Sequence, residues 1–280
     1  MKNPTATICL TIAVFLGSVG VTLSSDFQKG PNDAQSGDLE TVLREWEPLA
    51  KQGHGNLKNS YISKLHLPKS VLFLGNSLTY YNFSIPDTLS ELIKHSQIKL
   101  TPKIGQRAKG GYNLNDHYRY SFPLNNNKEW ELIVVQGHSK EALTGNGRDF
   151  FFSRARLLKR KITNADARMV LFMTWAYWDD ESMIDEINTS YLKIGNELGV
   201  QVVPVGLAFS NVNEKYAQID LYSDERHPSS EGTYLAACVF FAALFRKTPE
   251  GSEFFGSLDP DIAQILQQTA WSTVSKFYSW

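Results

Sequence analysis

Short apolar runs alternate with segments of helical spacing along most of the chain. The apolar runs predict strands over residues 71–74, 98–104, 132–135, 169–173 and 200–205. Apolar residues that recur every three or four positions predict helices over residues 89–95, 149–161, 182–198, 232–245 and 260–277. Strands that are apolar on both faces and separated by helices are typical of a parallel sheet covered on both sides. We therefore expect a three-layer α/β/α fold with a five-stranded, mainly parallel sheet.

The beginning of the chain has a different pattern. Residues 1–3 carry one positive charge, residues 8–21 are mostly apolar, and residues 22–25 include small residues. The apolar stretch is short for a transmembrane helix, which needs about 20 residues, and it has the layout of a secretory signal. We interpret residues 1–25 as a signal peptide, with an uncleaved N-terminal anchor as the alternative. Either interpretation predicts export, which makes the protein secreted or periplasmic.

The next segment, residues 26–60, precedes the alternation of strands and helices. It begins as a polar linker and continues with apolar residues at helical spacing, which predict a helix over residues 38–50. The alternation then occupies residues 61–280, which we expect to form one domain.

Composition and charge narrow the classes of function. Lys and Arg total 28 against 29 Asp and Glu, and no basic run is present, which argues against nucleic acid as a partner. We expect no membrane contact beyond the N-terminal anchor. Cleavage of the signal would remove Cys9 and leave Cys238, which lies in an apolar run. That position predicts a buried, unreactive thiol.

A first candidate for chemistry is the segment Gly75-Asn76-Ser77-Leu78-Thr79, which directly follows the first predicted strand. Ligands of such sheets bind beyond the carboxyl ends of the strands. A serine in a tight turn at that edge can act as a nucleophile, and a glycine before it allows the turn. The alternative for this segment alone is a turn in which Ser77 caps a helix.

A second candidate is Asp224-Glu225-Arg226-His227-Pro228, just before the helix at residues 232–245. The carboxylate can orient the imidazole and stabilise its charged form. Pro228 disfavours a helical His227 and keeps the pair in a loop. The alternative for this segment alone is a surface Asp–His turn. Taken together, the two segments predict a catalytic triad of Ser77, Asp224 and His227.

These two segments resemble the end blocks of the SGNH (GDSL-like) hydrolases. Residues 75–79 are similar to the Gly-Asp-Ser-Leu block of that family, with Asn76 in place of the usual Asp. Asp224-x-x-His227-Pro228 matches the last block, in which acid and base lie three residues apart. The resemblance spans about residues 69–245. It implies a flavodoxin-like SGNH hydrolase fold and an SGNH-type hydrolase domain over residues 61–280.

The resemblance also implies an oxyanion hole formed by the Ser77 N–H, a glycine N–H and an Asn side chain. Gly111 is the favoured glycine and Gly110 the alternative, although both also fit a flexible turn. The third block departs from the family, because Gln136-Gly137-His138-Ser139 stands where Gly-x-Asn-Asp is usual. It looks more like the Gln-Gly-Glu block of sialate and xylan O-acetylesterases. Since a Gln amide can donate as an Asn amide does, we expect Gln136 to be the third donor.

Several further residues are candidates for substrate binding. Trp175, Tyr177 and Trp178 follow the fourth predicted strand, where they can stack on a sugar ring or an acyl chain, or form a packing cluster. His138 is a candidate substrate contact or a structural histidine. No residues have metal-ligand spacing and no nucleotide-binding loop is present, so we expect no cofactor and no metal.

The function that these residues imply is a serine esterase acting through an acyl-enzyme at Ser77. The favoured substrate is an O-acetyl ester on a carbohydrate, so the expected partner is a small-molecule or glycan ester. One alternative is an acyltransferase on the same scaffold, and another is a non-catalytic glycan-binding protein.

Overall fold

The computed structural model describes residues 67–122, 129–145, 147–163 and 167–280. The chain divides into two units, residues 1–45 and 46–280, and all described residues belong to the second unit. The predicted signal peptide or anchor, the linker, the helix at residues 38–50 and the predicted domain start at residue 61 lie outside the described residues. No helix within the described ranges is long and apolar enough to cross a membrane.

The core of the described unit is a five-stranded sheet in the order β2-β1-β3-β4-β5. Every neighbouring pair of strands is parallel, which confirms the prediction of a mainly parallel sheet and sharpens it. The inner strands are almost entirely buried, as their apolar runs predict. The bounds of the strands are β1 (Ser70–Gly75), β2 (Lys103–Ala108), β3 (Leu132–Gln136), β4 (Arg168–Phe172) and β5 (Gln201–Val203).

The prediction for the second strand is wrong over most of its length. Residues 98–102 lie outside the sheet, and β2 begins only at Lys103, which pairs with Ser70 of β1. As an edge strand, β2 is half exposed and carries a mostly polar sequence, so no apolar run marks it. Ile98, which suggested the earlier start, packs against the core from the preceding loop.

The fifth strand is shorter than predicted, because its pairing with β4 ends at Val203. Pro204 follows, and Val205 begins α7 (Val205–Lys215), a helix that the sequence analysis does not predict. Its buried residues Val205, Ala208, Phe209 and Val212 have helical spacing. The short helices α2 (Ser77–Tyr80) and α4 (Leu114–Tyr120) are likewise absent from the prediction.

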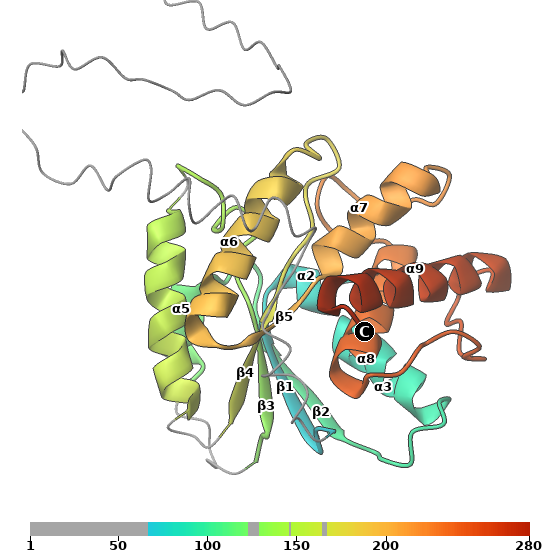
Figure 1. Ribbon diagram of the computed structural model, residues 1–280, viewed down its shortest axis with the longest axis horizontal. Coiled ribbons are helices and arrows are strands. Elements are labelled where there is room, and N and C mark those ends of the chain that lie inside the picture. The colour runs from blue at the N-terminus through green and yellow to red at the C-terminus, as the bar shows by residue number, and fades with distance from the viewer. Residues whose placement is uncertain (1–66, 123–128, 146, 164–166) are drawn as a thin grey trace, which may run out of the picture. The chain divides into compact units, whose positions relative to one another are not determined.

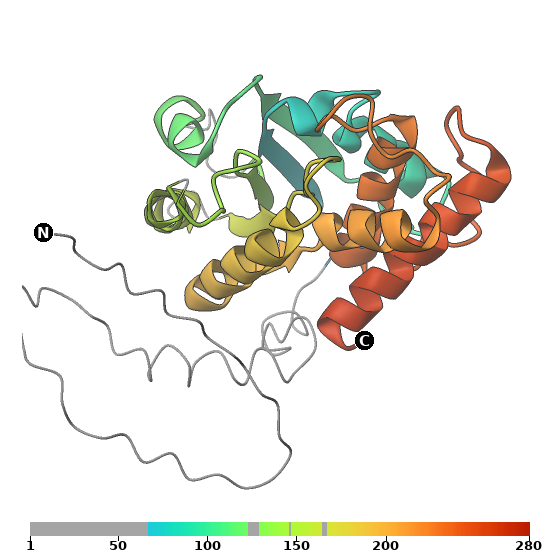
Figure 2. The same ribbon diagram turned by 90° about the horizontal axis from the view of Figure 1, so that it is seen from above.

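Helices cover both faces of the sheet, as expected for three layers. In Figure 1, α5 and α6 lie on one side of the sheet, and α3, α8 and α9 lie on the other. The view from above shows the same separation (Figure 2). These five helices confirm the predicted ones with shifted ends: α3 (Ile85–Lys94), α5 (Arg148–Thr163), α6 (Met183–Leu198), α8 (Ser230–Phe245) and α9 (Pro260–Tyr278).

Helix α8 is buried from Gly232 to Phe245, packed by α3, α7 and α9. This environment explains its apolar sequence. Cys238 is fully buried in α8, and burial raises the pKa of its thiol. The predicted burial of Cys238 is confirmed, and the raised pKa favours the thiol over the reactive thiolate.

Candidate active site

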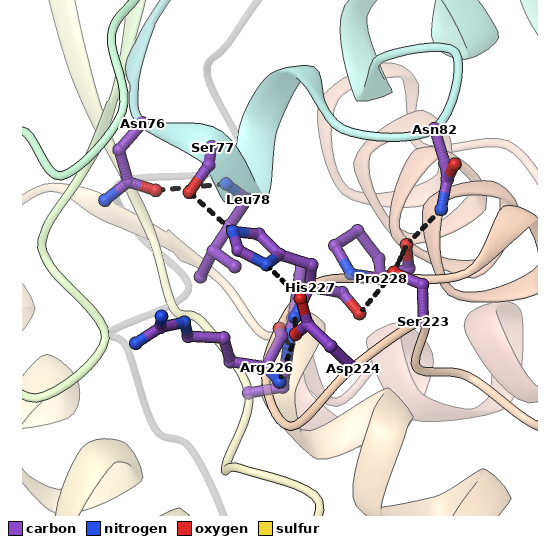
Figure 3. Close-up of polar contacts among 10 residues, drawn as sticks. Asn76, Ser77, Leu78, Asn82, Ser223, Asp224, Arg226, His227 and Pro228 are labelled. Atoms are coloured by element: carbon purple, nitrogen blue, oxygen red, sulfur yellow. Dashed lines mark hydrogen bonds and ion pairs between the residues drawn. The ribbon is translucent and has the colours of Figure 1, made fainter.

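Ser77, His227 and Asp224 form a hydrogen-bonded chain at the carboxyl edge of the sheet (Figure 3). The Nε2 atom of His227 lies 2.9 Å from Oγ of Ser77, and its Nδ1 atom lies 2.7 Å from Oδ2 of Asp224. In this geometry the imidazole can accept a proton from Ser77 while its Nδ1–H donates to the carboxylate. The structure thus brings together the three predicted triad residues, although Ser77 and His227 are 150 positions apart.

The carboxylate of Asp224 is held by its own loop. Its Oδ1 atom accepts hydrogen bonds from the backbone N–H groups of Arg226 at 2.9 Å and His227 at 2.8 Å. Burial acts to raise the pKa of Asp224, but these two bonds and the His227 imidazole lower it to about 2. The carboxylate is therefore ionised at neutral pH and can stabilise positive charge on the imidazole.

Ser77, the predicted nucleophile, lies in a tight turn between β1 and α2. Asn76 caps α2, because its Oδ1 atom accepts from the Leu78 N–H at 3.1 Å. Gly75 is required at the end of β1, since a Cβ there would lie 2.0 Å from Oγ1 of Thr79. Ser77 is the first residue of α2, so its N–H has no acceptor within that helix. The Ser77 N–H can therefore donate to a bound group.

Gln136 is fully buried at the end of β3, where it braces this turn. Its Nε2 atom donates to Oδ1 of Asn76 at 2.6 Å and to the Gly137 carbonyl at 3.3 Å. Its Oε1 atom accepts from Oγ1 of Thr79 at 2.5 Å and from the Asn76 N–H at 3.2 Å. Both amide hydrogens are used inside the protein, which contradicts the expectation that the Gln136 amide donates to an oxyanion.

Asn76 connects the nucleophile turn to the loops that follow β2 and β3. Its Nδ2 atom donates to the Tyr112 carbonyl at 2.9 Å and to the Gly137 carbonyl at 3.5 Å. Its Oδ1 atom accepts from Leu78 and Gln136. An Asp, usual at this position in the resembling family, could not make the two donations. The exchange of Asp for Asn is visible in the sequence, but this role of the amide is visible only in the folded protein.

A cavity of about 200 Å³ opens beside the nucleophile. Gly111 lines this cavity, has a φ of +74° and leaves open space where a Cβ would stand. Within the described ranges, no acceptor is bonded to the Gly111 N–H. Gly110, the alternative, does not line the cavity. The eight lining residues are Asn76, Ser77, Leu78, Gly111, His138, Ser139, Arg226 and His227.

Beneath the cavity, the buried carboxylate of Glu141 joins two of its loops. Its Oε2 atom accepts from the backbone N–H groups of His138 at 2.9 Å and Leu114 at 3.3 Å. Burial raises the pKa of Glu141 to about 7, against the effect of these two bonds. Glu141 therefore ties the start of α4, next to Gly111, to the loop after β3. No sequence motif singles out this role.

The three aromatic candidates lie in different places. Trp175 is buried, stacks on Phe209 with ring centroids 4.2 Å apart, and donates from Nε1 to the Arg226 carbonyl at 2.9 Å. Tyr177 is also buried, with its hydroxyl 2.9 Å from Oγ of Ser139. Both contradict the expectation of sugar-stacking rings and instead support the loops of the site. Trp178 is 65% exposed and outside the cavity lining, whereas His138 lines the cavity.

A residue that the sequence analysis overlooks is Tyr81, four positions after the nucleophile. Its ring stacks on the His227 imidazole, with centroids 4.4 Å apart and planes at 17°. The next residue, Asn82, donates from Nδ2 to the Pro228 carbonyl at 2.5 Å. Asn82, Phe83 and Ser84 all have positive φ, a strained run that persists where its surroundings hold it. These contacts hold His227 against α2, the helix that begins at Ser77.

Metal-binding potential is absent from the part of the chain that the structure describes. No group of three or more His, Cys, Asp or Glu side chains there is arranged to hold a metal ion.

Comparison with known proteins shows the fold. No protein-family model matches the chain, and no curated protein matches it either. Solved structures do match. A protein from Slackia heliotrinireducens, assigned as an SGNH hydrolase, aligns at 26% identity and a TM-score of 0.50, over 62% of this chain and 97% of that one.

Two further matches have lower identity. A DUF4886 family protein from Bacteroides uniformis aligns at 18% identity and a TM-score of 0.56, over 73% of this chain and 94% of that one. The acetylxylan esterase Axe2 from Geobacillus stearothermophilus aligns at 14% identity and a TM-score of 0.51, over 64% and 93%. The chain therefore has the SGNH hydrolase fold, and its structural neighbours include acetylxylan esterases.

Proposed function

We propose that the protein is a serine esterase that removes an O-acetyl group from a carbohydrate. The observation that supports this most directly is the continuous chain from Oγ of Ser77 through the His227 imidazole to the Asp224 carboxylate. The fold is shared with SGNH esterases, including acetylxylan esterases, which supports an acetylated sugar as substrate.

The reaction begins with attack of Oγ of Ser77 on the ester carbonyl carbon. The His227 Nε2 atom takes the hydroxyl proton, and the Asp224 carboxylate stabilises the resulting imidazolium. The tetrahedral intermediate then breaks its bond to the alcohol oxygen, which receives the proton from His227. The alcohol leaves, and the acetyl group is bonded to Ser77.

Deacylation repeats these steps with water. The neutral imidazole takes a proton from a water molecule, whose oxygen attacks the acyl-enzyme carbonyl. The bond between the carbonyl carbon and Oγ of Ser77 breaks, Oγ recovers its proton from His227, and acetic acid leaves, which ionises to acetate and a proton in solution. Atoms and charges balance without a cofactor.

Two backbone N–H groups form the oxyanion hole in this proposal, those of Ser77 and Gly111. Both residues line the cavity beside the nucleophile, and neither N–H is used elsewhere in the described contacts. Each such donor is worth about 3–4 kcal/mol of barrier. Gln136 acts indirectly, by fixing Asn76 and Thr79 behind Ser77.

Export is part of the same proposal. Residues 1–25 have the layout of a signal peptide, so the mature enzyme would act in the periplasm or outside the cell. N-terminal sequencing of the protein recovered from those compartments tests this point.

The central test compares the mature protein with Ser77→Ala on acetylated sugars and small acetyl esters. We expect the variant to lose at least about 10³-fold in kcat, because the covalent route needs the hydroxyl. Its melting temperature should match that of the wild type. Equal acetate release by the two proteins would exclude Ser77 as the nucleophile, and acetyl transfer to an added acceptor sugar would indicate a transferase instead.

A further inference from the structure

The wall of the cavity beside Ser77 carries a positive charge, Arg226, with the carboxylates of Asp224 and Glu225 nearby but outside the lining. Of the eight lining residues, only Arg226 has a permanently charged side chain, and among the described residues no carboxylate belongs to the lining. Arg226 lies between the acid and the base of the triad, in the same loop. Arg226 therefore lines the same cavity as Ser77, where the ester of a substrate would bind.

Arg226 is exposed and available to a ligand. No carboxylate of the described residues lies within ion-pair distance of it. The nearby Asp224 carboxylate is directed to the backbone N–H groups and imidazole of its loop. In Figure 3 the Arg226 side chain extends away from Asp224, toward the side of the site that holds Asn76.

The backbone of Arg226 is anchored by a buried side chain. Its carbonyl accepts a hydrogen bond from Nε1 of the buried Trp175 at 2.9 Å, which anchors the loop backbone. Contact with Tyr177 is the largest cause that raises the pKa of Arg226. The anchored backbone keeps the exposed Arg226 at the wall of the cavity, where its guanidinium can reach a bound ligand.

A second cation, Lys140, reinforces the charge. Its Nζ atom lies 4.8 Å from the centre of the Tyr177 ring, next to Ser139 of the cavity lining. The pKa of His138, which faces the cavity, is lowered by burial and then by the positive charges of Arg226 and Lys140. The positive charges of Arg226 and Lys140 therefore both reach His138 in the cavity lining.

We propose that the substrate carries an anionic oxygen group, a carboxylate or a phosphate, and that Arg226 binds this group. The inference rests on the proposed esterase function. Because an acetyl group has no charge, the anionic group belongs to the alcohol, which makes the substrate class acetylated acidic sugars. A guanidinium presents paired N–H donors that match carboxylate and phosphate oxygens, and this pairing gives orientation as well as affinity.

The test measures acetate release from three monoacetylated sugars that differ in one group. These are methyl glucoside, methyl glucuronoside and methyl glucoside 6-phosphate, which separate the neutral, carboxylate and phosphate cases. At low ionic strength we expect kcat/KM for at least one anionic sugar to exceed that for the neutral sugar by about tenfold, mainly through KM. Salt should reduce this preference, because it screens exposed charges.

Arg226→Gln should remove most of the preference, and Arg226→Lys should keep part of it. Lys276→Gln is the matched control, because it removes the same charge from an exposed residue in the last turn of α9. That variant should keep the full preference. Melting temperatures of all variants check that the fold is intact.

Two results would overturn the inference while leaving the esterase function in place. One is equal hydrolysis of neutral and anionic sugars by the wild type, and the other is a preference that survives Arg226→Gln as it survives Lys276→Gln. Two other results would exclude the proposed function and this inference with it. One is a wild type that releases no acetate from any sugar or small ester. The other is acetate release that is unchanged by Ser77→Ala.

Discussion

At the scale of single residues, the site depends on the side-chain amide of Asn76. Asn76 stands where the resembling family usually has Asp, and its side chain both donates and accepts. It donates to the carbonyls of Tyr112 and Gly137 and accepts from Leu78 and Gln136. An Asn at position 76 and a Gln at position 136 therefore form one complementary pair.

We expect Asn76→Asp to be harmful although it restores the usual family residue. The carboxylate would face two carbonyl oxygens and make neither donation, at a cost of about 2–4 kcal/mol in the free energy of unfolding. The turn that holds Ser77 and the loop that holds Gly111 would lose a shared anchor, so kcat should fall at least about tenfold. Urea denaturation and acetate release measure the two effects.

Asn196→Asp is the control for this experiment, because Asn196 is an exposed residue of α6. It makes the same change of charge and should leave both the unfolding free energy and kcat close to the wild-type values. A stable, fully active Asn76→Asp would show that the amide donations contribute little.

Some residues of the site can be predicted from the sequence and others cannot. Ser77, Asp224 and His227 could be identified because their chemistry needs fixed residue types in short, spaced motifs. The type and position of Gln136 predict an oxyanion donor, yet in the folded protein its amide bonds to Thr79 and Asn76 instead. Arg226 and Tyr81 carry no motif, because an exposed cation and a stacking ring are common everywhere.

At the scale of elements, the cavity is a junction of loops rather than the product of one helix or strand. Glu141 joins the N-terminus of α4 to the loop after β3 through two backbone N–H groups. Its Oε1 atom is buried without a partner among the described residues. A protonated carboxyl, or a Gln, can keep the two acceptor contacts at Oε2 without a buried negative charge.

This arrangement predicts a pH-dependent stability. With its pKa raised from 4.5 to about 7 by burial, Glu141 binds its proton more tightly in the folded state than in the unfolded state. Its contribution to stability is complete below about pH 4.5 and is lost as the pH rises through about 7. The loss amounts to about 3 kcal/mol, from a shift of roughly two and a half pKa units.

Glu141→Gln should remove this dependence, because an amide does not titrate. The unfolding free energy of the variant minus that of the wild type should rise by about 3 kcal/mol between pH 4.5 and 8. Buried His117, whose pKa is lowered to about 4 mainly by burial, acts in the opposite direction between pH 4 and 6.5. Because both proteins contain His117, its contribution cancels in the difference. A difference that stays constant with pH would show that Glu141 has the same pKa in the folded and the unfolded state.

Elements differ in how visible they are to sequence analysis, for a physical reason. Strands β1, β3 and β4 are buried on both faces, so burial leaves an apolar run at nearly every position. Edge strand β2 is half exposed and leaves no such mark. Helix α7 directly follows β5, so that the apolar residues of strand and helix merge into one run.

At the scale of the whole described unit, the topology assembles the site. Ser77 follows β1, which lies inside the sheet beside β2 and β3, so the loops after all three strands meet at one edge. The loop with Asp224 and His227 arrives from α7 and leads into α8, and contacts with Trp175 and Trp178 after β4 position it. The alternation of strands and helices predicts that these loops meet. The hydrogen bonds that fix their exact positions depend on the packed structure and are not visible in the sequence.

We expect a substitution in α9 to change stability without changing the proposed esterase activity. The buried hydroxyl of Tyr278 donates to the Val202 carbonyl at 2.6 Å and accepts from Nε2 of Gln201 at 3.2 Å. Tyr278→Phe leaves these β5 groups partly unsatisfied, so the unfolding free energy should fall by about 1–3 kcal/mol. Because α9 contributes no residue to the catalytic cavity, kcat measured well below the melting temperature should stay within about twofold of wild type.

Tyr120→Phe provides the matched control, since Tyr120 is 61% exposed and the same hydroxyl is removed there. The control should change neither quantity. If kcat for Tyr278→Phe fell by as much, expressed as a free energy, as the unfolding free energy, the β5 edge and the loops around Ser77 would be energetically coupled. An unchanged unfolding free energy would mean that water replaces the lost hydroxyl. The Tyr278 hydroxyl would then contribute little to the packing of α9 against β5.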